Sequence, residues 1–247
     1  MADVSLPAAR YDRLDFNSPL SAERASLLLA EAELAGGATA VDLGCGWGEL
    51  LLRALEYAPG ANGDGVDTAT DALDRGRRNA DARRLADRVT FHAAEAASWD
   101  RSGYDLAICI GSSHAWQGGT DEALAALRRT VRPGGRVIFG EGFWQRPPTP
   151  EALDGLGAEP DDFDTLANLV DRATAARFVP LLVSTANRDE WEVFESRYCG
   201  GLERWLLANP DHPDAVDVRE AVEAHRNGWL RGYRDVLGLA YLVLAAT

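Results

Sequence analysis

Short apolar runs alternate with longer amphipathic stretches along most of the first 141 residues. The apolar runs are typical of buried strands, which we expect at residues 40–43, 89–92, 104–110 and 136–141, and we expect a further short strand at 63–67. Apolar residues recur at helical spacing between them, and we expect helices at residues 49–59, 70–85 and 121–131. Strands separated by helices at this cadence indicate right-handed crossovers and a mostly parallel sheet.

The two ends of the chain add elements to this pattern. Asn17-Ser18-Pro19 offers a cap and a first-turn proline for a helix that would stop at Gly36-Gly37. The proline-rich run Gln145–Pro150 should leave the sheet, because proline fits neither a helix interior nor a central strand. Beyond it we expect helices at 161–176, 188–207 and 214–236, a strand at 178–185 and a last strand at 239–245.

These elements predict an α/β fold. We expect a Rossmann-like, doubly wound, mostly parallel seven-stranded sheet, with helices on both faces and helical insertions after strands five and six. One domain should span residues 1–247. Within it we expect an N-terminal helix and lid at 1–37, a cofactor-binding core at 38–145, substrate-side helical insertions around strand six at 146–237 and the last strand at 238–247.

The segment Val41–Gly48 predicts a cofactor site. It is a buried strand that ends in Asp42 and continues into a turn with glycine at positions 44, 46 and 48, after which a helix starts. Glycine allows positive φ angles and lets a ligand approach the backbone closely. A dinucleotide fold would need G-x-G-x-x-G, whereas here Glu49 occupies the position of the third glycine and its carboxylate would repel a pyrophosphate. The pattern suits a cofactor that has no phosphate and carries a cationic amine.

Charge and composition exclude several function classes. The net charge of −14 disfavours nucleic acid and anionic membranes as partners, and the arginines between residues 75 and 88 alternate with acids as on a solvated helix. All 25 basic residues are arginine, which rules out a Schiff-base lysine and a P-loop lysine. The three cysteines are too far apart in sequence for a metal knuckle, and no metal is expected. The chain shows no signal pattern and no spanning apolar run, so we expect a cytoplasmic protein.

Five ordered motifs between residues 38 and 145 resemble those of the class I S-adenosylmethionine-dependent methyltransferases, of the bacterial small-molecule type. They are Asp42–Gly48, Gly65–Asp67, the acid Glu95, the strand Tyr104–Gly111, and Leu127–Phe139 with its Pro-Gly-Gly. The resemblance implies S-adenosyl-L-methionine as cofactor and S-adenosyl-L-homocysteine as product. It also implies that the glycine turn passes under the methionine portion, that Asp42 orients the amino group, that Asp67 binds the ribose hydroxyls and that Glu95 lies beside the adenine. The expected cofactor-binding residues are Asp42, Gly44, Cys45, Gly46, Trp47, Gly48, Asp67, Thr68, Ala94, Glu95, Ala96, Ile110 and Gly111.

The implied reaction is an in-line transfer of the methyl group to a small-molecule acceptor, which depends mainly on proximity. If the acceptor must lose a proton, His114 is the candidate base, and Glu141 could bind a cationic or hydroxylated acceptor. His114 and Glu141 are therefore the predicted catalytic residues. The predicted substrate-binding residues are Tyr11, which would close as part of a lid, His114, Trp116, Glu141 and Trp144.

Two alternatives stay open at this point. The chain could be an NAD(P)-dependent Rossmann oxidoreductase, or a non-catalytic regulator that binds S-adenosylmethionine. The sequence identifies neither the acceptor nor the atom that is methylated, and it leaves monomer and homodimer equally open.

Overall fold

The computed structural model describes residues 8–247, and its internal contacts divide the chain into two compact units. The sheet unit comprises Ser21–Gly142, Leu166–Thr185 and Leu239–Thr247. The helical unit comprises Met1–Leu20, of which residues 1–7 lie outside the described part, with Phe143–Thr165 and Ala186–Gly238.

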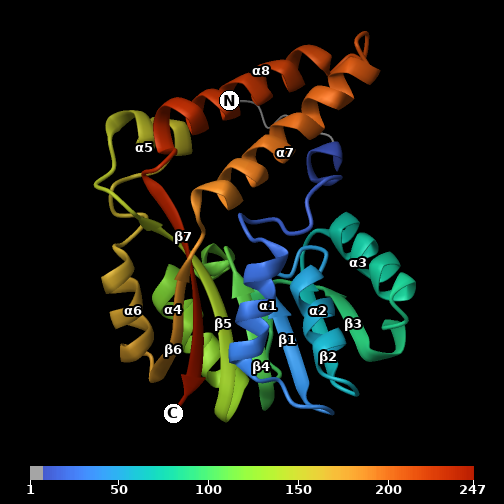
Figure 1. Ribbon diagram of the computed structural model, residues 1–247, viewed down its shortest axis with the longest axis vertical. Coiled ribbons are helices and arrows are strands. Elements are labelled where there is room, and N and C mark those ends of the chain that lie inside the picture. The colour runs from blue at the N-terminus through green and yellow to red at the C-terminus, as the bar shows by residue number, and fades with distance from the viewer. Residues whose placement is uncertain (1–7) are drawn as a thin grey trace. The chain divides into compact units, whose positions relative to one another are not determined.

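A seven-stranded sheet in the order β3-β2-β1-β4-β5-β7-β6 forms the sheet unit (Figure 1). The first five strands pair in parallel, and β6 pairs antiparallel with β7. Their bounds are β1 Thr39–Leu43, β2 Asn62–Asp67, β3 Val89–Ala93, β4 Tyr104–Ile110, β5 Val131–Trp144, β6 Phe178–Thr185 and β7 Leu237–Ala246. The predicted Rossmann-like, mostly parallel seven-stranded sheet is confirmed.

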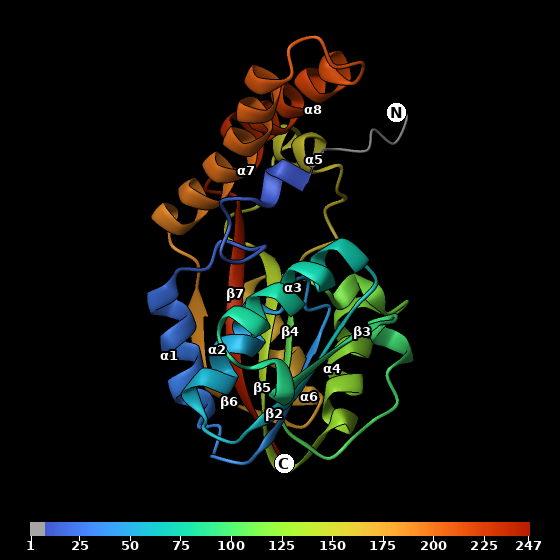
Figure 2. The ribbon, with the colours of Figure 1, turned by 90° about the vertical axis from the view of Figure 1, so that its right-hand side faces the viewer.

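Helices cover both faces of this sheet. The helices α1 (Ala22–Ala32), α2 (Glu49–Tyr57) and α3 (Thr70–Ala82) lie on one face, and α4 (Gly119–Thr130) lies on the other next to α6 (Leu166–Ala175) (Figure 2). The apolar stripe of α2 is buried, with Leu51, Leu52 and Leu55 almost fully inaccessible to solvent. Burying each such side chain contributes about 1.5–3 kcal/mol, so packing of this stripe holds the helix on the sheet. Short 3₁₀ turns occur at Ala86–Arg88 (η2), Ala96–Ser98 (η3) and Ser113–Ala115 (η4).

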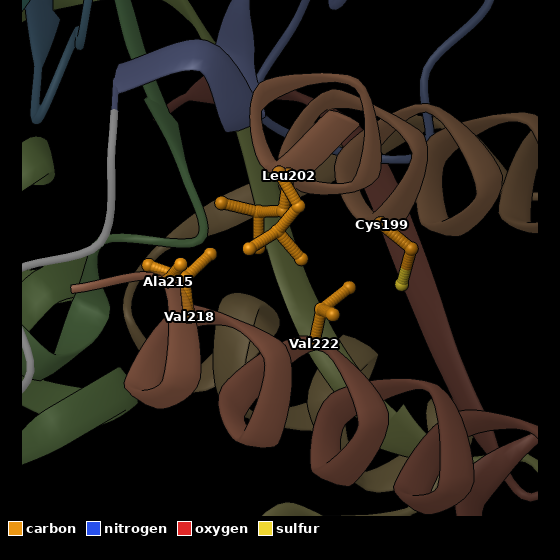
Figure 3. Close-up of a cluster of buried hydrophobic side chains, with 6 residues drawn as sticks. Cys199, Leu202, Ala215, Val218 and Val222 are labelled. Atoms are coloured by element: carbon orange, nitrogen blue, oxygen red, sulfur yellow. The ribbon is translucent and has the colours of Figure 1, made fainter. Parts of the chain in front are cut away.

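The helical unit is built around the antiparallel pair α7 (Arg188–Ala208) and α8 (Ala215–Asn227). It also contains the short 3₁₀ turn η1 (Ala8–Tyr11), α5 (Pro150–Leu156) and the π-helix η5 (Gly228–Tyr233). Asn187 caps α7 through a capping box with Glu190, which satisfies amides that the first turn would leave unpaired. Small apolar side chains fill the space between α7 and α8 (Figure 3). They are Cys199, Leu202, Leu206, Ala215, Val218 and Val222.

The predicted start of the first helix is wrong. Asn17-Ser18-Pro19 does not cap it; Ser21 does, by accepting from the amide of Arg24, and the helix begins at Ala22. The helix also ends before Gly36-Gly37, because Glu33 already has a left-handed backbone with φ of 51°. Ser18 and Ser21 are both suitable caps, and a helical stretch follows each of them. The residue pattern favoured Ser18 because Pro19 suits the first position of a helix.

The boundaries after strand four also differ from the prediction. Pro133-Gly134-Gly135, expected to close the fourth helix, lies inside β5, where pairing with β4 jumps from Tyr104↔Val131 to Leu106↔Arg136. Pro150 starts α5 at the position in a helix where a missing amide is harmless, with Thr149 as cap. The expected helix at 161–176 is shortened to α6, and the one at 214–236 continues as a π-helix after Asn227. Within residues 8–247 no helix combines the length and apolar character that a membrane crossing requires.

Candidate functional site

The glycine turn after β1 is fixed to the neighbouring strand by its own backbone. The amides of Gly44 and Cys45 donate to the carbonyl oxygen of Val66 at 2.8 and 3.0 Å. Gly44, Gly46 and Gly48 have φ angles of 78°, 55° and 66°, which residues with a Cβ rarely adopt. The sequence alternates glycine here because the chain must reverse direction within one turn before α2 begins.

The three glycines face different surroundings. A Cβ on Gly44 would lie 2.1 Å from Ser112 Oγ, and a Cβ on Gly48 would lie 2.6 Å from the ring of Phe91. A Cβ on Gly46 would meet no atom within 4 Å, and the same holds for Gly111 at the end of β4. Gly44 and Gly48 are therefore required for packing, whereas the backbone at Gly46 and Gly111 is open to a ligand. This geometry fits a cradle for a flat or extended cofactor.

Asp42 is a buried acid beneath this turn. Its side chain is 5 % exposed, and its pKa is raised from 3.8 to about 8 by burial and by the negative charge of Asp67. No donor among the described residues offsets this effect. A cation at this place would favour the ionised carboxylate, which is the property expected of a residue that binds an amino group.

Asp67, at the carboxyl end of β2, braces the turn. Its two carboxylate oxygens accept from the amide of Gly46 at 2.7 Å and from the amide of Ala69 at 2.8 Å. The second bond stabilises the start of α3, and the first holds Gly46 in its left-handed conformation. Each oxygen keeps a further lone pair that can accept from a hydroxyl group.

Glu49 corrects one step of the sequence argument. Its carboxylate is only 7 % exposed, and it pairs with Arg53 at 2.7 Å and with Arg83 at 2.6 Å. Two guanidinium groups balance its charge, so the repulsion of a pyrophosphate that we expected from it is weakened. The case against a dinucleotide then depends on the glycine spacing and on the likeness to known proteins given below.

The residues expected around the adenine lie at the ends of β2 and β3 in the same unit. The amide of Ala94 donates to the carbonyl oxygen of Asp67 at 3.1 Å, which links the two strand ends. Glu95 and Thr68 are exposed, whereas Ala96 is buried at the start of η3. These strand ends therefore present one acid and one hydroxyl to solvent beside Asp67.

Trp47 is a core residue rather than an exposed wall. It is 4 % exposed, and the guanidinium of Arg75 stacks on its ring at 4.0 Å. Cys45 beside it has a pKa raised by burial and by the nearby carboxylates, so it carries a protonated thiol and acts as a small polarisable side chain.

Ser112, which the sequence analysis missed, connects the glycine turn to the end of β4. Its buried hydroxyl lies 3.3 Å from the carbonyl oxygen of Gly44 and 3.2 Å from that of Ile110. The amide of Gly111 donates to the carbonyl oxygen of Gly140, which ties the residue after β4 to β5. These bonds join residues up to 68 positions apart, a separation at which sequence pattern carries no signal.

The two predicted catalytic residues lie close together at this edge. Glu141 is half-buried and accepts from the Gly142 amide at 3.0 Å, from the Thr120 hydroxyl at 3.5 Å and from the Ser113 hydroxyl. Burial raises the pKa of Glu141, and these bonds and the charge of His114 act in the opposite direction. His114 is exposed in η4, whereas Trp116 is 5 % exposed. Trp116 therefore serves the core of the sheet unit more than a substrate surface.

Two predicted substrate residues belong to the helical unit. Tyr11 packs edge-on against Tyr198 at 6.2 Å. Trp144 is 8 % exposed, its indole Nε1 donates to the carbonyl oxygen of Pro160 at 2.8 Å, and its ring contacts Phe163. The indole donor of Trp144 is thus already satisfied within its own unit. Nowhere in residues 8–247 do three His, Cys, Asp or Glu side chains gather closely enough to hold a metal ion.

Comparisons with known proteins address the family. Residues 41–137 match the model of a family described as a methyltransferase domain. The structure is similar to that of an S-adenosylmethionine-dependent methyltransferase from Geobacter sulfurreducens in complex with S-adenosyl-L-homocysteine, with a TM-score of 0.89 and 26 % identity over 99 % of this chain and 100 % of that one. The chain belongs to the class I S-adenosylmethionine-dependent methyltransferases. The predicted family, its cofactor and the enzyme class are confirmed.

Curated methyltransferases and one relative without an assigned function share this sequence pattern. The uncharacterized protein YjhP of Escherichia coli is 28 % identical over 93 % of both chains. Demethylmenaquinone methyltransferase of Thermus thermophilus is 33 % identical over 60 % of this chain and 66 % of its own length. The similarity to the YjhP protein includes the helical insertions. The match to the Thermus thermophilus enzyme spans 153 residues and covers only part of the chain.

Proposed function

We propose that this methyltransferase transfers the methyl group of S-adenosylmethionine to a small-molecule acceptor. The buried, unpaired acid Asp42 beneath an open glycine turn carries the proposal, since such an acid favours a ligand with a cationic amine. The cofactor, when bound, supplies an activated methyl group. The protein then needs to bind, align the acceptor and exclude water, and it needs a base only if the acceptor must lose a proton.

The cofactor residues of this proposal all belong to the sheet unit. Gly44–Gly48 would pass under the methionine portion, with Asp42 at its amino group. Asp67 would bind the ribose hydroxyls with its remaining lone pairs, and Glu95 would lie beside the adenine. The strand ends that carry Ile110 and Gly111 would complete the site.

The acceptor side of the proposal depends on His114 and Glu141. His114 is exposed, so its imidazole can be reached by an acceptor and is the candidate base. A small molecule is favoured over nucleic acid because the chain has a net charge of −14. The demethylmenaquinone methyltransferase among its relatives, whose name gives a small molecule as acceptor, supports the same class. Tyr11, Trp116 and Trp144 stay predictions as substrate contacts.

Calorimetry tests the cofactor assignment. S-adenosylmethionine and S-adenosylhomocysteine should bind to the purified protein, and NADH should not. Asp67→Ala should weaken binding of S-adenosylhomocysteine by about 2 kcal/mol, because a charged hydrogen-bond pair to the ribose is lost. Asp71→Ala, a matched change at an exposed acid in the first turn of α3, should leave the affinity unchanged. Binding of NADH, or no binding of either sulfur ligand, would contradict the proposal.

A further inference from the structure

The half-buried Glu141 differs from the buried Glu49 in its partners. Its carboxylate accepts from one amide and two hydroxyls, all of them uncharged: Gly142, Thr120 and Ser113. Glu49, by contrast, is buried between two arginines. Uncharged donors orient a carboxylate without balancing its negative charge. None of these three hydrogen bonds therefore brings a positive charge to Glu141.

No lysine exists in the chain to provide that charge, and no arginine in residues 8–247 forms an ion pair with Glu141. His114 is the basic residue whose charge acts on this carboxyl group, and it is exposed. Asp42 and Glu141 also flank Cys109 of β4, since both carboxylates raise the pKa of its buried thiol. An acceptor that approaches this end of β4 and β5 therefore meets the half-buried Glu141 carboxylate, with which no arginine of the described residues is paired.

We propose that the methyl acceptor carries a basic nitrogen and that Glu141 binds its ammonium form, with Ser113 and Thr120 as positioning residues that hold the carboxylate. This inference depends on the proposed function. An ammonium group supplies both the missing positive charge and N–H donors, and such charged hydrogen bonds are about twice as strong as neutral ones. An alcohol or a thiol would leave the carboxylate charge unbalanced.

The same contact prepares the nitrogen for reaction. An ammonium nitrogen has no free electron pair, so one N–H bond must break before it can act as a nucleophile. The electron pair stays on nitrogen and the proton moves to a carboxylate oxygen of Glu141, which gives a neutral amine and a carboxylic acid. Burial favours this direction because it raises the pKa of Glu141. His114, exposed on the adjacent turn, can pass the proton on to water.

A labelling experiment identifies the atom that is methylated. The protein is incubated with a bacterial metabolite extract and S-adenosylmethionine that carries a deuterated methyl group, and fragmentation in a mass spectrometer locates the label in each product. We expect the label on nitrogen. A label on oxygen, sulfur or carbon alone would overturn the inference, as would the absence of any labelled product. Calorimetry with S-adenosylhomocysteine on the same preparation tests the proposed function separately.

Variants then test the role of Glu141 with the labelled amine as substrate. Glu141→Gln should raise the KM for the amine about tenfold or more. It should also remove the pH dependence with which the amine binds to protein loaded with S-adenosylhomocysteine. The affinity for S-adenosylhomocysteine should stay unchanged, which shows that the variant is folded. Thr120→Val and Ser113→Ala should raise KM less.

Glu122→Gln provides the matched control, because Glu122 is exposed at the start of α4 and bonds only to its own turn. Its KM should equal that of the unchanged protein. A KM for the amine that Glu141→Gln leaves within twofold would overturn the role of Glu141.

Discussion

Asp42 shows how one residue can oppose folding and still favour binding. Its carboxyl group is buried next to a second acid, so the folded chain holds its proton up to a pH of about 8. The unfolded chain releases the same proton near the ordinary value of 3.8. A ligand cation can reverse this preference, because it stabilises the ionised form where the protein alone does not.

The stability of the cofactor-free protein should therefore depend on pH in a defined direction. Because the folded pKa of Asp42 is raised, folded protein binds more protons than unfolded protein between pH 3.8 and about 8, and the free energy of unfolding falls as pH rises through that window. Asp42→Asn should flatten this dependence and stabilise the free protein by about 1–3 kcal/mol at pH 7, while it weakens binding of S-adenosylhomocysteine. Urea titrations at several pH values check the slope. A variant that keeps the pH slope of the parent would show that another group titrates.

The central strands β1 and β4 could be predicted from sequence because each is a short, largely apolar run that is almost wholly buried. The limits of β4 match the expected residues, and those of β1, β2 and β3 differ by one residue. Helix ends were harder, since Ser21 and Ser18 offer similar caps and only tertiary packing decides between them. Asp42 and Asp67 were evident as candidates for cofactor binding from their places at strand ends. Ser113 and Thr120 were not, because they contact Glu141 across separate elements.

The glycine turn allows a prediction that separates packing from binding. Gly44→Ala would place a Cβ 2.1 Å from Ser112 Oγ at a φ of 78°, and it should destabilise the protein by about 2–4 kcal/mol. The Cβ that Gly46→Ala adds would have no atom within 4 Å, so this substitution should destabilise the protein by only about 1 kcal/mol, through backbone strain. Binding of S-adenosylhomocysteine should nevertheless fall at least tenfold in Gly46→Ala, because its methyl group enters the open side of the turn. Thermal unfolding with and without ligand measures both effects. Equal losses of stability in the two variants would contradict this division.

At the scale of the whole molecule, the two units carry different polar networks. In the helical unit the buried Glu195 accepts from His225 Nε2 at 2.7 Å and from the Tyr233 hydroxyl at 2.8 Å. These bonds tie α7 to α8 and to the π-helix that follows it. The proposed cofactor residues lie in the sheet unit, so damage to this network should affect stability without changing the proposed cofactor site.

Glu195→Gln tests this separation. We expect the variant to be less stable by about 1–3 kcal/mol, because a charged acceptor is removed from the buried Tyr233 hydroxyl and the partly exposed His225 ring. Its affinity for S-adenosylhomocysteine, measured by calorimetry well below the unfolding temperature, should equal that of the parent. Glu192→Gln, at a partly exposed position on the same helix, is the control and should change stability by less than about 0.5 kcal/mol. A large loss of cofactor affinity in Glu195→Gln would show that the helical unit contributes to that site.

The Ser112 hydroxyl between Gly44 and Ile110 has a consequence for the order of events during turnover. A ligand that shifts the glycine turn should also shift the loop that carries Ser113 and His114, because the Ser112 hydroxyl at the start of that loop bonds to the Gly44 carbonyl oxygen. Thermodynamic linkage then requires reciprocity. If bound cofactor raises the affinity for the acceptor by some factor, bound acceptor raises the affinity for the cofactor by the same factor. The same coupling would act on the products. S-adenosylhomocysteine would dissociate more slowly while the methylated product is still bound.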